Sequence, residues 1–266
     1  MRLELRQAGV RIDSRWPIRG ASLALRSGHL TTIVGPNGAG KTTLMRLLSG
    51  LWRLTEGEAF VDEQDLYSLS RRNLAKRIAF SPQDTHLSFA FTVRDVVLMG
   101  RHAHLGRFER EGERDYRAVA EAMERADVAG LAERVVTELS GGERQRVVIA
   151  RSLATEADAI ILDEPTANLD VSHTLDIMNL CRELASEGKI VVLSTHDLNL
   201  AARYSAEVVL VSAGRVVATG AAEEVLSEGR IWEVFGVCSE RLTAPSGETI
   251  FLFHCRSDGS KLREVT

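Results

Sequence analysis

The stretch that decides the fold is GPNGAGKTT, residues 35–43, which matches the pattern G-x-x-x-x-G-K-[ST]. It follows HLTTIVG (29–35), which is apolar enough to form a buried strand. It leads into KTTLMRLLSGL (41–51), whose apolar residues recur at helical spacing. A strand, a glycine-rich turn and a helix in this order predict a phosphate-binding loop, which we call the phosphate loop.

Each part of the phosphate loop has a physical task. Glycines let backbone N–H groups curl round phosphate oxygens without Cβ clashes, and the helix N-terminus adds its partial positive charge. We expect Lys41 to reach the β- and γ-phosphates of a nucleotide and Thr42 to offer its hydroxyl to Mg²⁺. The predicted nucleotide-binding residues are Gly35, Pro36, Asn37, Gly38, Ala39, Gly40, Lys41, Thr42 and Thr43.

Two further apolar runs end in residues suited to phosphate chemistry. AIILDEP (159–165) ends in Asp163, placed to hold Mg²⁺, and Glu164, placed to polarise an attacking water. VVLSTHD (191–197) carries His196 to the sheet edge where α/β folds bind ligands, which predicts a contact with the γ-phosphate. A solvated acidic turn and a structural histidine are the simpler alternatives for these residues.

Strands and helices alternate over most of the chain, which predicts an α/β fold with a mainly parallel sheet. The first 30 residues resemble short strands of an antiparallel β-subdomain, and residues 88–155 are helical in period. We therefore expect an α-helical subdomain inserted in the core. Residues 221–266 are expected to add one short helix and a hairpin around APSGETIFLF (244–253), packed on the same domain.

Composition narrows the class of protein. The 266 residues carry a net charge of −4, which argues against a nucleic-acid binder that works through a broad basic surface. Cys181, Cys238 and Cys255 form no CxxC pattern, which favours reduced thiols in a cytosolic protein. No run approaches the roughly 18 apolar residues of a membrane-spanning helix, and the N-terminus lacks the apolar core of a signal peptide. We expect a protein that does not cross a membrane by itself.

A second candidate anion site lies in LSGGERQRV, residues 139–147. Ser140 and Glu143 form an S-x-x-E capping box, which explains these two residues as a helix start. It does not explain the adjacent Gly141 and Gly142, which cost helix stability but bare backbone N–H groups for an anion. Two phosphate cradles of one chain cannot easily hold one nucleotide. A second copy of the chain resolves this, because each cradle then pairs with the other copy's.

The order and spacing of GPNGAGKTT, LSGGERQRV, ILDEP, ANLD and STHD resemble the nucleotide-binding subunits of ABC transporters over roughly residues 1–220. The resemblance implies a P-loop NTPase (RecA-like) fold, with 1–220 as the ABC ATPase domain. It also implies a head-to-tail homodimer that sandwiches two ATP molecules with Mg²⁺. In such a dimer the residues that face the partner's ATP would be Ser140, Gly141, Gly142 and Asp170.

Two more site residues follow from the same resemblance. Gln83 in FSPQD matches the family's glutamine loop, which touches Mg²⁺ and the attacking water and moves with the membrane partner. Trp16 is the nearest aromatic residue upstream of the phosphate loop. It is a candidate for stacking on adenine, with a surface turn as the alternative. The catalytic set is thus Glu164, His196 and Gln83, and the Mg²⁺ set is Thr42, Gln83 and Asp163.

The segment after Gln83, SFAFTVRDVVLMGRHAHLGRFERE (88–111), resembles importers of iron-siderophore complexes, haem and cobalamin. In these importers it receives a short coupling helix from the permease. His102 and His104 have no third ligand nearby, which favours surface contact over a metal site.

This resemblance implies an ATP-hydrolysing subunit at the cytoplasmic face of the inner membrane. Its partners would be permease subunits and, indirectly, a substrate-binding protein, with no nucleic acid. The alternatives are a soluble ABC-type ATPase of DNA repair or translation, and an exporter ATPase. The chain shows no coiled-coil insertion, zinc motif or second cassette of the kind usual in the soluble class. Because the chain does not touch the cargo, the choice among the three cargoes stays open.

Overall fold

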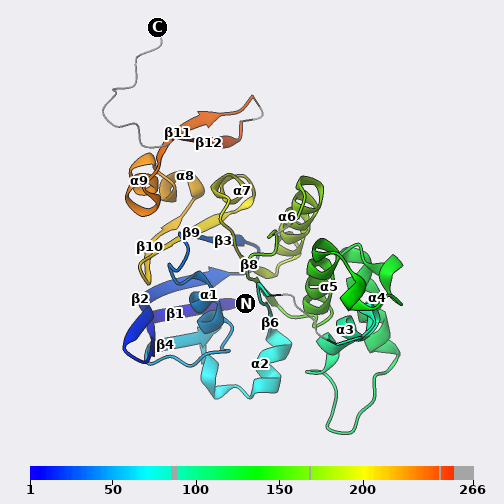
Figure 1. The fold of residues 1–266 in the computed structure, drawn as a ribbon. Helices are drawn as coiled ribbons and strands as arrows, with labels where there is room; N and C mark the ends of the chain where they lie inside the picture. Colours follow the sequence, from blue (N-terminus) through cyan, green and yellow to red (C-terminus); the bar gives the residue numbers. More distant parts are fainter. Residues whose placement is uncertain (85–88, 168, 246, 255–266) are drawn as a thin grey trace.

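The fold is built on a six-stranded, mainly parallel β-sheet (Figure 1). The computed structural model describes residues 1–84, 89–167, 169–245 and 247–254. In spatial order the strands of the sheet are β10 (Arg215–Gly220), β9 (Glu207–Ser212), β3 (Leu30–Val34), β8 (Ile190–Ser194), β7 (Ala159–Leu162) and β6 (Ile78–Ser81). Neighbouring strands run parallel except at one edge, where β10 pairs antiparallel with β9.

The central strands β3, β7 and β8 are buried at every position and mostly apolar, because both faces of this sheet are covered. On β8, Val192 belongs to a core shared with α1 (Lys41–Leu48), whereas Val191 and Leu193 pack in a core shared with α6 (Val171–Ser186). Successive side chains of one strand therefore serve two different cores, as the two-residue period of a strand requires.

A second, antiparallel sheet is formed by the N-terminal part of the chain. Its strands lie in the order β2 (Arg15–Arg26), β1 (Arg2–Ile12), β4 (Glu56–Val61) and β5 (Gln64–Asp65). Leu3, Leu5 and Leu25 from this sheet are buried in the same core as α1. The short helices η1 (Leu66–Ser68) and α2 (Arg71–Arg77) then lead into β6.

A group of helices follows β6 and has a core of its own. Val96, Val119 and Val147 are buried together in it, one from each of the three main helices. We call this group the helical subdomain, and it lies beyond the β6 edge of the large sheet in Figure 1. It contains α3 (Val93–Leu98), η2 (Met99–Arg101), α4 (Glu113–Arg125), η3 (Ala129–Leu131), η4 (Val136–Glu138) and α5 (Gly141–Leu153). The predicted α/β fold, with an antiparallel β-subdomain and an inserted helical subdomain, is confirmed.

The C-terminal part differs from the prediction of one short helix. It has two, α8 (Ala222–Val225) and α9 (Glu228–Phe235), because Leu226 leaves the helical conformation and the Ser227 side chain caps the second helix. The predicted hairpin is present as β11 (Cys238–Thr243) and β12 (Thr249–His254), although residues 255–266 and Ser246 lie outside the described residues. It is attached to α7 (Leu198–Tyr204), whose Asn199 bonds both the N–H (2.7 Å) and the carbonyl (3.1 Å) of Phe251.

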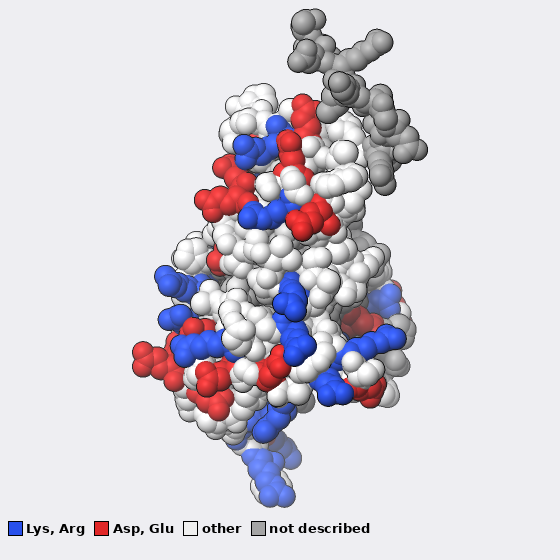
Figure 2. All heavy atoms as spheres, turned by 90° about the vertical axis from the view of Figure 1, so that its left-hand side faces the viewer, with Lys and Arg blue, Asp and Glu red and all other residues white. Residues whose placement is uncertain are grey.

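The structure shows where the cysteines, the apolar segments and the surface charges lie. Cys181 is buried and Cys238 is exposed, both as free thiols, whereas Cys255 lies outside the described residues. Within the part of the chain that the structure describes, no helix is both long and apolar enough to cross a membrane. On the face drawn in Figure 2, basic and acidic side chains are interspersed over most of the surface, and basic ones occupy its lower end.

The packing of η2 against α5 predicts a cost for substituting Gly100. A Cβ at this position would overlap the carbonyl oxygen of Arg151, which belongs to the backbone of α5 and cannot move aside. We expect Gly100→Ala to lower the free energy of unfolding by about 1–3 kcal/mol, the usual cost of overpacking. Gly130→Ala is the matched control, because nothing lies within 4 Å of the Cβ it would add. Equal urea midpoints for the two variants would contradict this packing.

Candidate functional site

Four neighbouring parallel strands deliver the predicted site residues to one edge of the large sheet. The phosphate loop follows β3, His196 follows β8, Asp163 and Glu164 follow β7, and Gln83 follows β6. Because β3, β8, β7 and β6 are adjacent and parallel, their carboxyl ends lie side by side. The crevice outside these ends is where open α/β sheets bind ligands.

The phosphate loop is held closely against strand β2. Gly40 has a left-handed φ of 108°, and a Cβ there would lie 2.5 Å from the carbonyl oxygen of Pro17. Gly40 also stands at the N-cap of α1 without a side-chain cap, so no side chain of its own occupies the first N–H groups of that helix. Asn37 and Gly38 are exposed at the outer part of the loop. This arrangement leaves backbone donors and a helix N-terminus available to an anion.

Lys41 lies beneath the loop with its ammonium group already engaged. Its Nζ donates to the carbonyl oxygens of Gly35 (2.9 Å) and Pro36 (3.3 Å), and the residue is only 6% exposed. Burial lowers the pKa of Lys41, and the nearby carboxylates of Glu164 and Asp163 act in the opposite direction. A phosphate oxygen could replace the carbonyl partners and supply the negative charge that the buried ammonium favours.

Asp163 is buried and only half satisfied. Its Oδ1 accepts a hydrogen bond of 2.7 Å from the hydroxyl of Ser194, whereas its Oδ2 has no hydrogen-bond partner among the described residues. A buried carboxylate oxygen without a partner is costly and suits a hard cation. Thr42, in α1 after β3, and Gln83, after β6, follow the two strands that flank β8 and β7 and carry side-chain oxygens. These residue types fit Mg²⁺.

Glu164 brings the three predicted catalytic residues together. Its Oε1 lies 2.5 Å from Nε2 of His196, and its Oε2 accepts a hydrogen bond of 2.7 Å from the side-chain amide of Gln83. The side chain is 12% exposed, and the backbone has a left-handed φ of 49°. Such a φ is uncommon outside glycine and needs support from its surroundings.

Ser194 was not recognised from the sequence, yet it joins the two acids. Its hydroxyl donates to Asp163 Oδ1 and accepts the backbone N–H of Glu164 at 2.9 Å. It is fully buried at the end of β8. The only signal in the sequence is a hydroxyl residue at the end of an otherwise apolar strand, which by itself does not distinguish a structural serine from a positioning one.

The residues Ser140–Gly142, which we call the signature segment, form the exposed start of α5. The predicted capping box is present: the Ser140 hydroxyl accepts the Glu143 N–H at 3.2 Å, and the Glu143 carboxylate accepts the Ser140 N–H at 2.7 Å. The hydrogen bond from the Ser140 backbone N–H to the carboxylate is the main cause that holds the pKa of Glu143 below its usual value. Gly141 has nothing within 4 Å of an added Cβ, so its surroundings are open.

The loop that contains Asp170 lies beside the signature segment of the same chain. A Cβ on Gly142 would lie 3.1 Å from the side chain of Leu169. Asp170 itself caps α6, accepting the backbone N–H of His173 at 2.9 Å, and its side chain stays 64% exposed. By contrast, α5 and α1 are well separated in Figure 1, which puts the helix of the phosphate loop and the helix of the signature segment in different parts of the molecule.

Trp16 lies in strand β2, directly before the residue that touches Gly40. The structure therefore places it in a strand rather than a turn. Its ring is half-buried and stacks against the guanidinium of Arg19, 4.7 Å from the ring centroid. One face of the indole thus has a partner in the protein, and stacking of Trp16 on adenine stays a prediction.

His102 and His104 follow η2 and have separate surroundings. His104 Nε2 donates to the carbonyl of Thr155 at 2.8 Å, while His102 is exposed beside α2 and the end of α5. Among the described residues, no cluster of three His, Cys, Asp or Glu side chains is arranged to hold a metal ion.

Known sequences match this arrangement. The ABC transporter family profile matches residues 18–167. The chain is 47% identical to the cobalamin import ATP-binding protein BtuD of Halobacterium salinarum, over 88% of this chain but 57% of that protein. It is 43% identical to the hemin import ATP-binding protein HmuV of Rhodococcus jostii, over 87% and 79% of the two chains. It is 34% identical to the iron(3+)-hydroxamate import ATP-binding protein FhuC of Bacillus subtilis, over 91% of both.

Solved structures match as well. A metal-chelate type ABC transporter in an inward-facing conformation superposes with a TM-score of 0.83 and 29% identity, covering 95% of this chain and 97% of that one. A dimeric bacterial ABC transporter cassette gives a TM-score of 0.73 and 29% identity, covering 83% and 99%.

The contacts of Ser194 predict that its hydroxyl stabilises the folded chain. Ser194→Ala would leave Asp163 Oδ1 and the Glu164 N–H without their partner in a buried place. We expect the free energy of unfolding to fall by about 1–3 kcal/mol, the usual cost of a buried unsatisfied group. Ser186→Ala removes an exposed hydroxyl that bonds only within its own helix end, and we expect a change below about 0.5 kcal/mol. Chemical denaturation of both variants checks this, and equal losses would contradict the role of Ser194.

Proposed function

The chain belongs to the ABC transporter family, and from this we propose that it is the ATP-hydrolysing subunit of a membrane importer for a metal chelate. One observation supports the proposal: the site at the sheet edge has its own phosphate loop and acids, whereas the signature segment starts a different helix, α5, beside the loop that contains Asp170. A chain built this way has two half-sites, and two copies in opposite orientation would complete both.

In the proposed dimer the two half-sites meet across each nucleotide. The phosphate loop, Lys41 and Trp16 would bind ATP from one copy. Ser140, Gly141 and Gly142 of the other copy would direct the open start of α5 at the γ-phosphate, where a helix N-terminus favours negative charge. The exposed Asp170 would lie at the same interface, because Leu169 touches Gly142. A bacterial ABC transporter cassette with 29% identity has a dimeric structure, which supports an assembly of two copies.

The chemistry proposed for this site is in-line attack of water on the γ-phosphate. Glu164 would orient the water and accept its proton. Gln83 and His196 both lie within hydrogen-bond distance of the Glu164 carboxylate and would hold it in place. Once ATP is bound, His196 would turn to the γ-phosphate. The protein supplies mainly position and charge in such a reaction.

Mg²⁺ would be held by Asp163, Thr42 and Gln83. These residues fit Mg²⁺ for two reasons. Asp163 Oδ2 has no hydrogen-bond partner among the described residues, and all three side chains can offer an oxygen ligand. When bound, Mg²⁺ supplies positive charge that offsets the charge of the phosphates. Ser194 keeps Asp163 in position by holding its other oxygen.

A groove on the surface of this chain is the proposed docking site for the permease. An open cavity of about 530 Å³ lies between α2 and the end of α5, beside η2, with mainly apolar walls that include Leu51, Ala79 and Met99. Ile78, Ala79 and Phe80 of β6 line it, so a short permease helix seated there would lie close to the strand that leads to Gln83. We propose that dimer closure reaches the permease through Gln83 and residues 90–108.

The location and cargo follow from the same proposal. The chain would sit on the cytoplasmic face of the membrane against two permease subunits, and a substrate-binding protein would deliver the cargo on the other side.

Residues 1–220 would form the ATPase domain, with 88–155 inserted in it and 221–266 packed on it. The cargo class is a metal ion enclosed by an organic ligand, since relatives are named for cobalamin, hemin and iron(3+)-hydroxamate import. Uptake assays with these three compounds would choose among them.

Glu164 gives the most direct test of the proposed chemistry. Glu164→Gln keeps the shape and the Gln83 contact but removes the carboxylate that would take the water proton. We expect ATP binding and a stable ATP-bound dimer, with hydrolysis lowered about 100-fold or more. Glu121→Gln, an exposed change on α4, is the control and should hydrolyse ATP at the parent rate. If Glu164→Gln also keeps the parent rate, the role given to Glu164 is wrong.

Leu51 tests the permease groove. It is 48% exposed on a groove wall, so Leu51→Glu would place a charge where the proposed permease helix packs. Membranes from cells that express the chain with a metal-chelate permease of the same genome should retain about one-tenth of the parent amount. ATP hydrolysis by the purified chain should stay within about twofold of the parent. Ile12→Glu, at 41% exposure on β1, is the matched control. Equal membrane retention of both variants would refute this docking site.

A further inference from the structure

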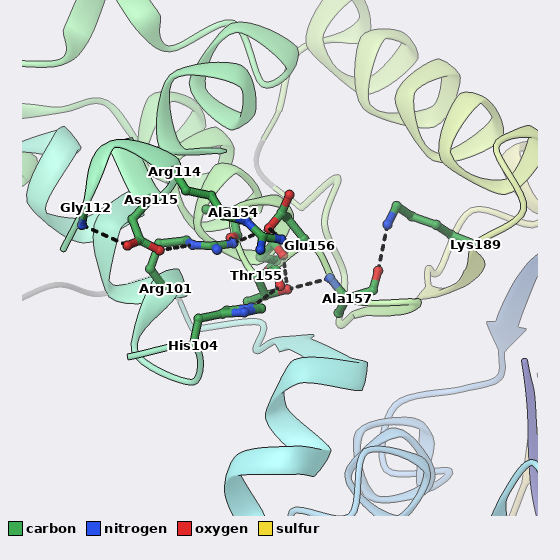
Figure 3. Close-up of polar contacts among 11 residues, drawn as sticks. Arg101, His104, Gly112, Arg114, Asp115, Ala154, Thr155, Glu156, Ala157 and Lys189 are labelled. Carbon is green, nitrogen blue, oxygen red and sulfur yellow. Dashed lines mark hydrogen bonds and ion pairs between the residues drawn. The ribbon is translucent and has the colours of Figure 1, made fainter. Parts of the chain in front are cut away.

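Arg101 is a buried arginine outside the proposed nucleotide site. It ends η2, and its side chain is 1% exposed. Figure 3 shows its guanidinium between Asp115 on one side and the residues that follow α5 on the other. An arginine is rarely buried to this degree unless it is paired, because a buried charge is costly.

The guanidinium joins three parts of the helical subdomain. Its Nε donates to Asp115 Oδ1 at 2.9 Å, and Asp115 also accepts the N–H of Gly112 at the start of α4. Its Nη1 donates to the carbonyl of Ala154 at 2.8 Å, just after the end of α5, and to Glu156 Oε2 at 2.7 Å. We call Arg101, Asp115, Ala154 and Glu156 the Arg101 cluster. Its fixed, fork-like geometry sets the position of the end of α5 relative to η2 and α4.

The cluster acts on the short junction that links α5 to β7 of the large sheet. Glu156 in this junction has a left-handed φ of 54°, which is uncommon for a residue with a Cβ and needs support from its surroundings. The carbonyl of Thr155 accepts from His104, and the carbonyl of Ala157 accepts from Lys189 Nζ at 2.8 Å. Lys189 lies directly before β8, so the junction is held from the side of the sheet as well as from the helical subdomain.

The other end of α5 carries the signature segment. The helix has 13 residues, so it spans about 20 Å at 1.5 Å per residue. A helix of this length moves as one body, and a change of angle at the junction displaces Ser140–Gly142 relative to the sheet. The same junction borders the permease groove, which is lined by His102 and Ala103 on one side and by Arg151 and Thr155 on the other.

We infer that Arg101 is a positioning residue for the signature segment: by clamping the α5–β7 junction it fixes the angle between α5 and the large sheet. Two copies can then meet across the nucleotide with this angle already fixed. If the angle varied in the single copy, fixing it on dimerisation would cost free energy and weaken the association. This inference rests on the proposed two-copy site. It differs from a purely structural role, because loosening the clamp should weaken assembly of the dimer and leave nucleotide binding by one copy unchanged.

The test uses Glu156→Gln in the Glu164→Gln chain, which is expected to form a stable ATP-bound dimer. This change weakens one arm of the Arg101 cluster at its more exposed end and keeps the buried pair with Asp115. Sedimentation with ATP and Mg²⁺ should show a dimer dissociation constant raised about tenfold, equal to about 1.4 kcal/mol. Binding of a fluorescent ATP analogue at concentrations where the chain is a single copy should change less than twofold. Arg101→Lys, which cannot reach all three partners at once, should act in the same direction.

Arg117→Gln is the matched control, because Arg117 is exposed on α4 and pairs with Glu113 outside the cluster. It should leave both measurements unchanged. If Glu156→Gln and Arg101→Lys dimerise as tightly as their parent, the inference is wrong while the proposed function stands. If both lose nucleotide binding and dimerisation in equal proportion, Arg101 is merely structural and the inference is again wrong. If the Glu164→Gln parent itself fails to dimerise, the two-copy site falls and the inference falls with it.

Discussion

The parallel alignment of four adjacent strands is the constraint on which the rest of this molecule depends. Because β3, β8, β7 and β6 run in the same direction, their carboxyl ends meet at one edge. Residues far apart in the chain therefore come within hydrogen-bond distance, as Gln83, His196 and Glu164 do. Ser194 and Lys41 are buried at this edge and therefore depend on their partners, which among the described residues are neighbours in the site.

The helical subdomain carries the signature segment on a separate helix. It places the signature segment on α5, apart from α1, and it is joined to the sheet by a short junction that the Arg101 cluster holds. In the proposed dimer, a helix start on α5 would bind the phosphate of a nucleotide that the phosphate loop of a second copy supplies. We propose that the sheet edge holds the residues that act on ATP, and that the helical subdomain of a second copy completes each catalytic centre.

The sequence allows most of the fold and the residue types of the site to be predicted, because both leave local signals. Apolar strands such as 190–194 and helices with a clear period are visible in short windows, and the phosphate loop has a fixed pattern. Long-range pairs between buried polar groups leave no such signal, so Ser194 and Arg101 became apparent only in the structure. The C-terminal sequence predicts one short helix where the structure has two, because only Leu226 and the capping Ser227 separate α8 from α9. The ring of Trp16 contacts Arg19, which no local pattern indicates.

The central claim is that one chain holds only half of each catalytic centre. It is tested most directly by the rate of ATP hydrolysis per chain over a wide range of chain concentrations, with the assembly state followed by sedimentation in the same samples. We expect the rate per chain to fall on dilution in step with the fraction of paired chains and to approach zero for single copies. A full rate per chain in samples that contain only single copies would contradict it.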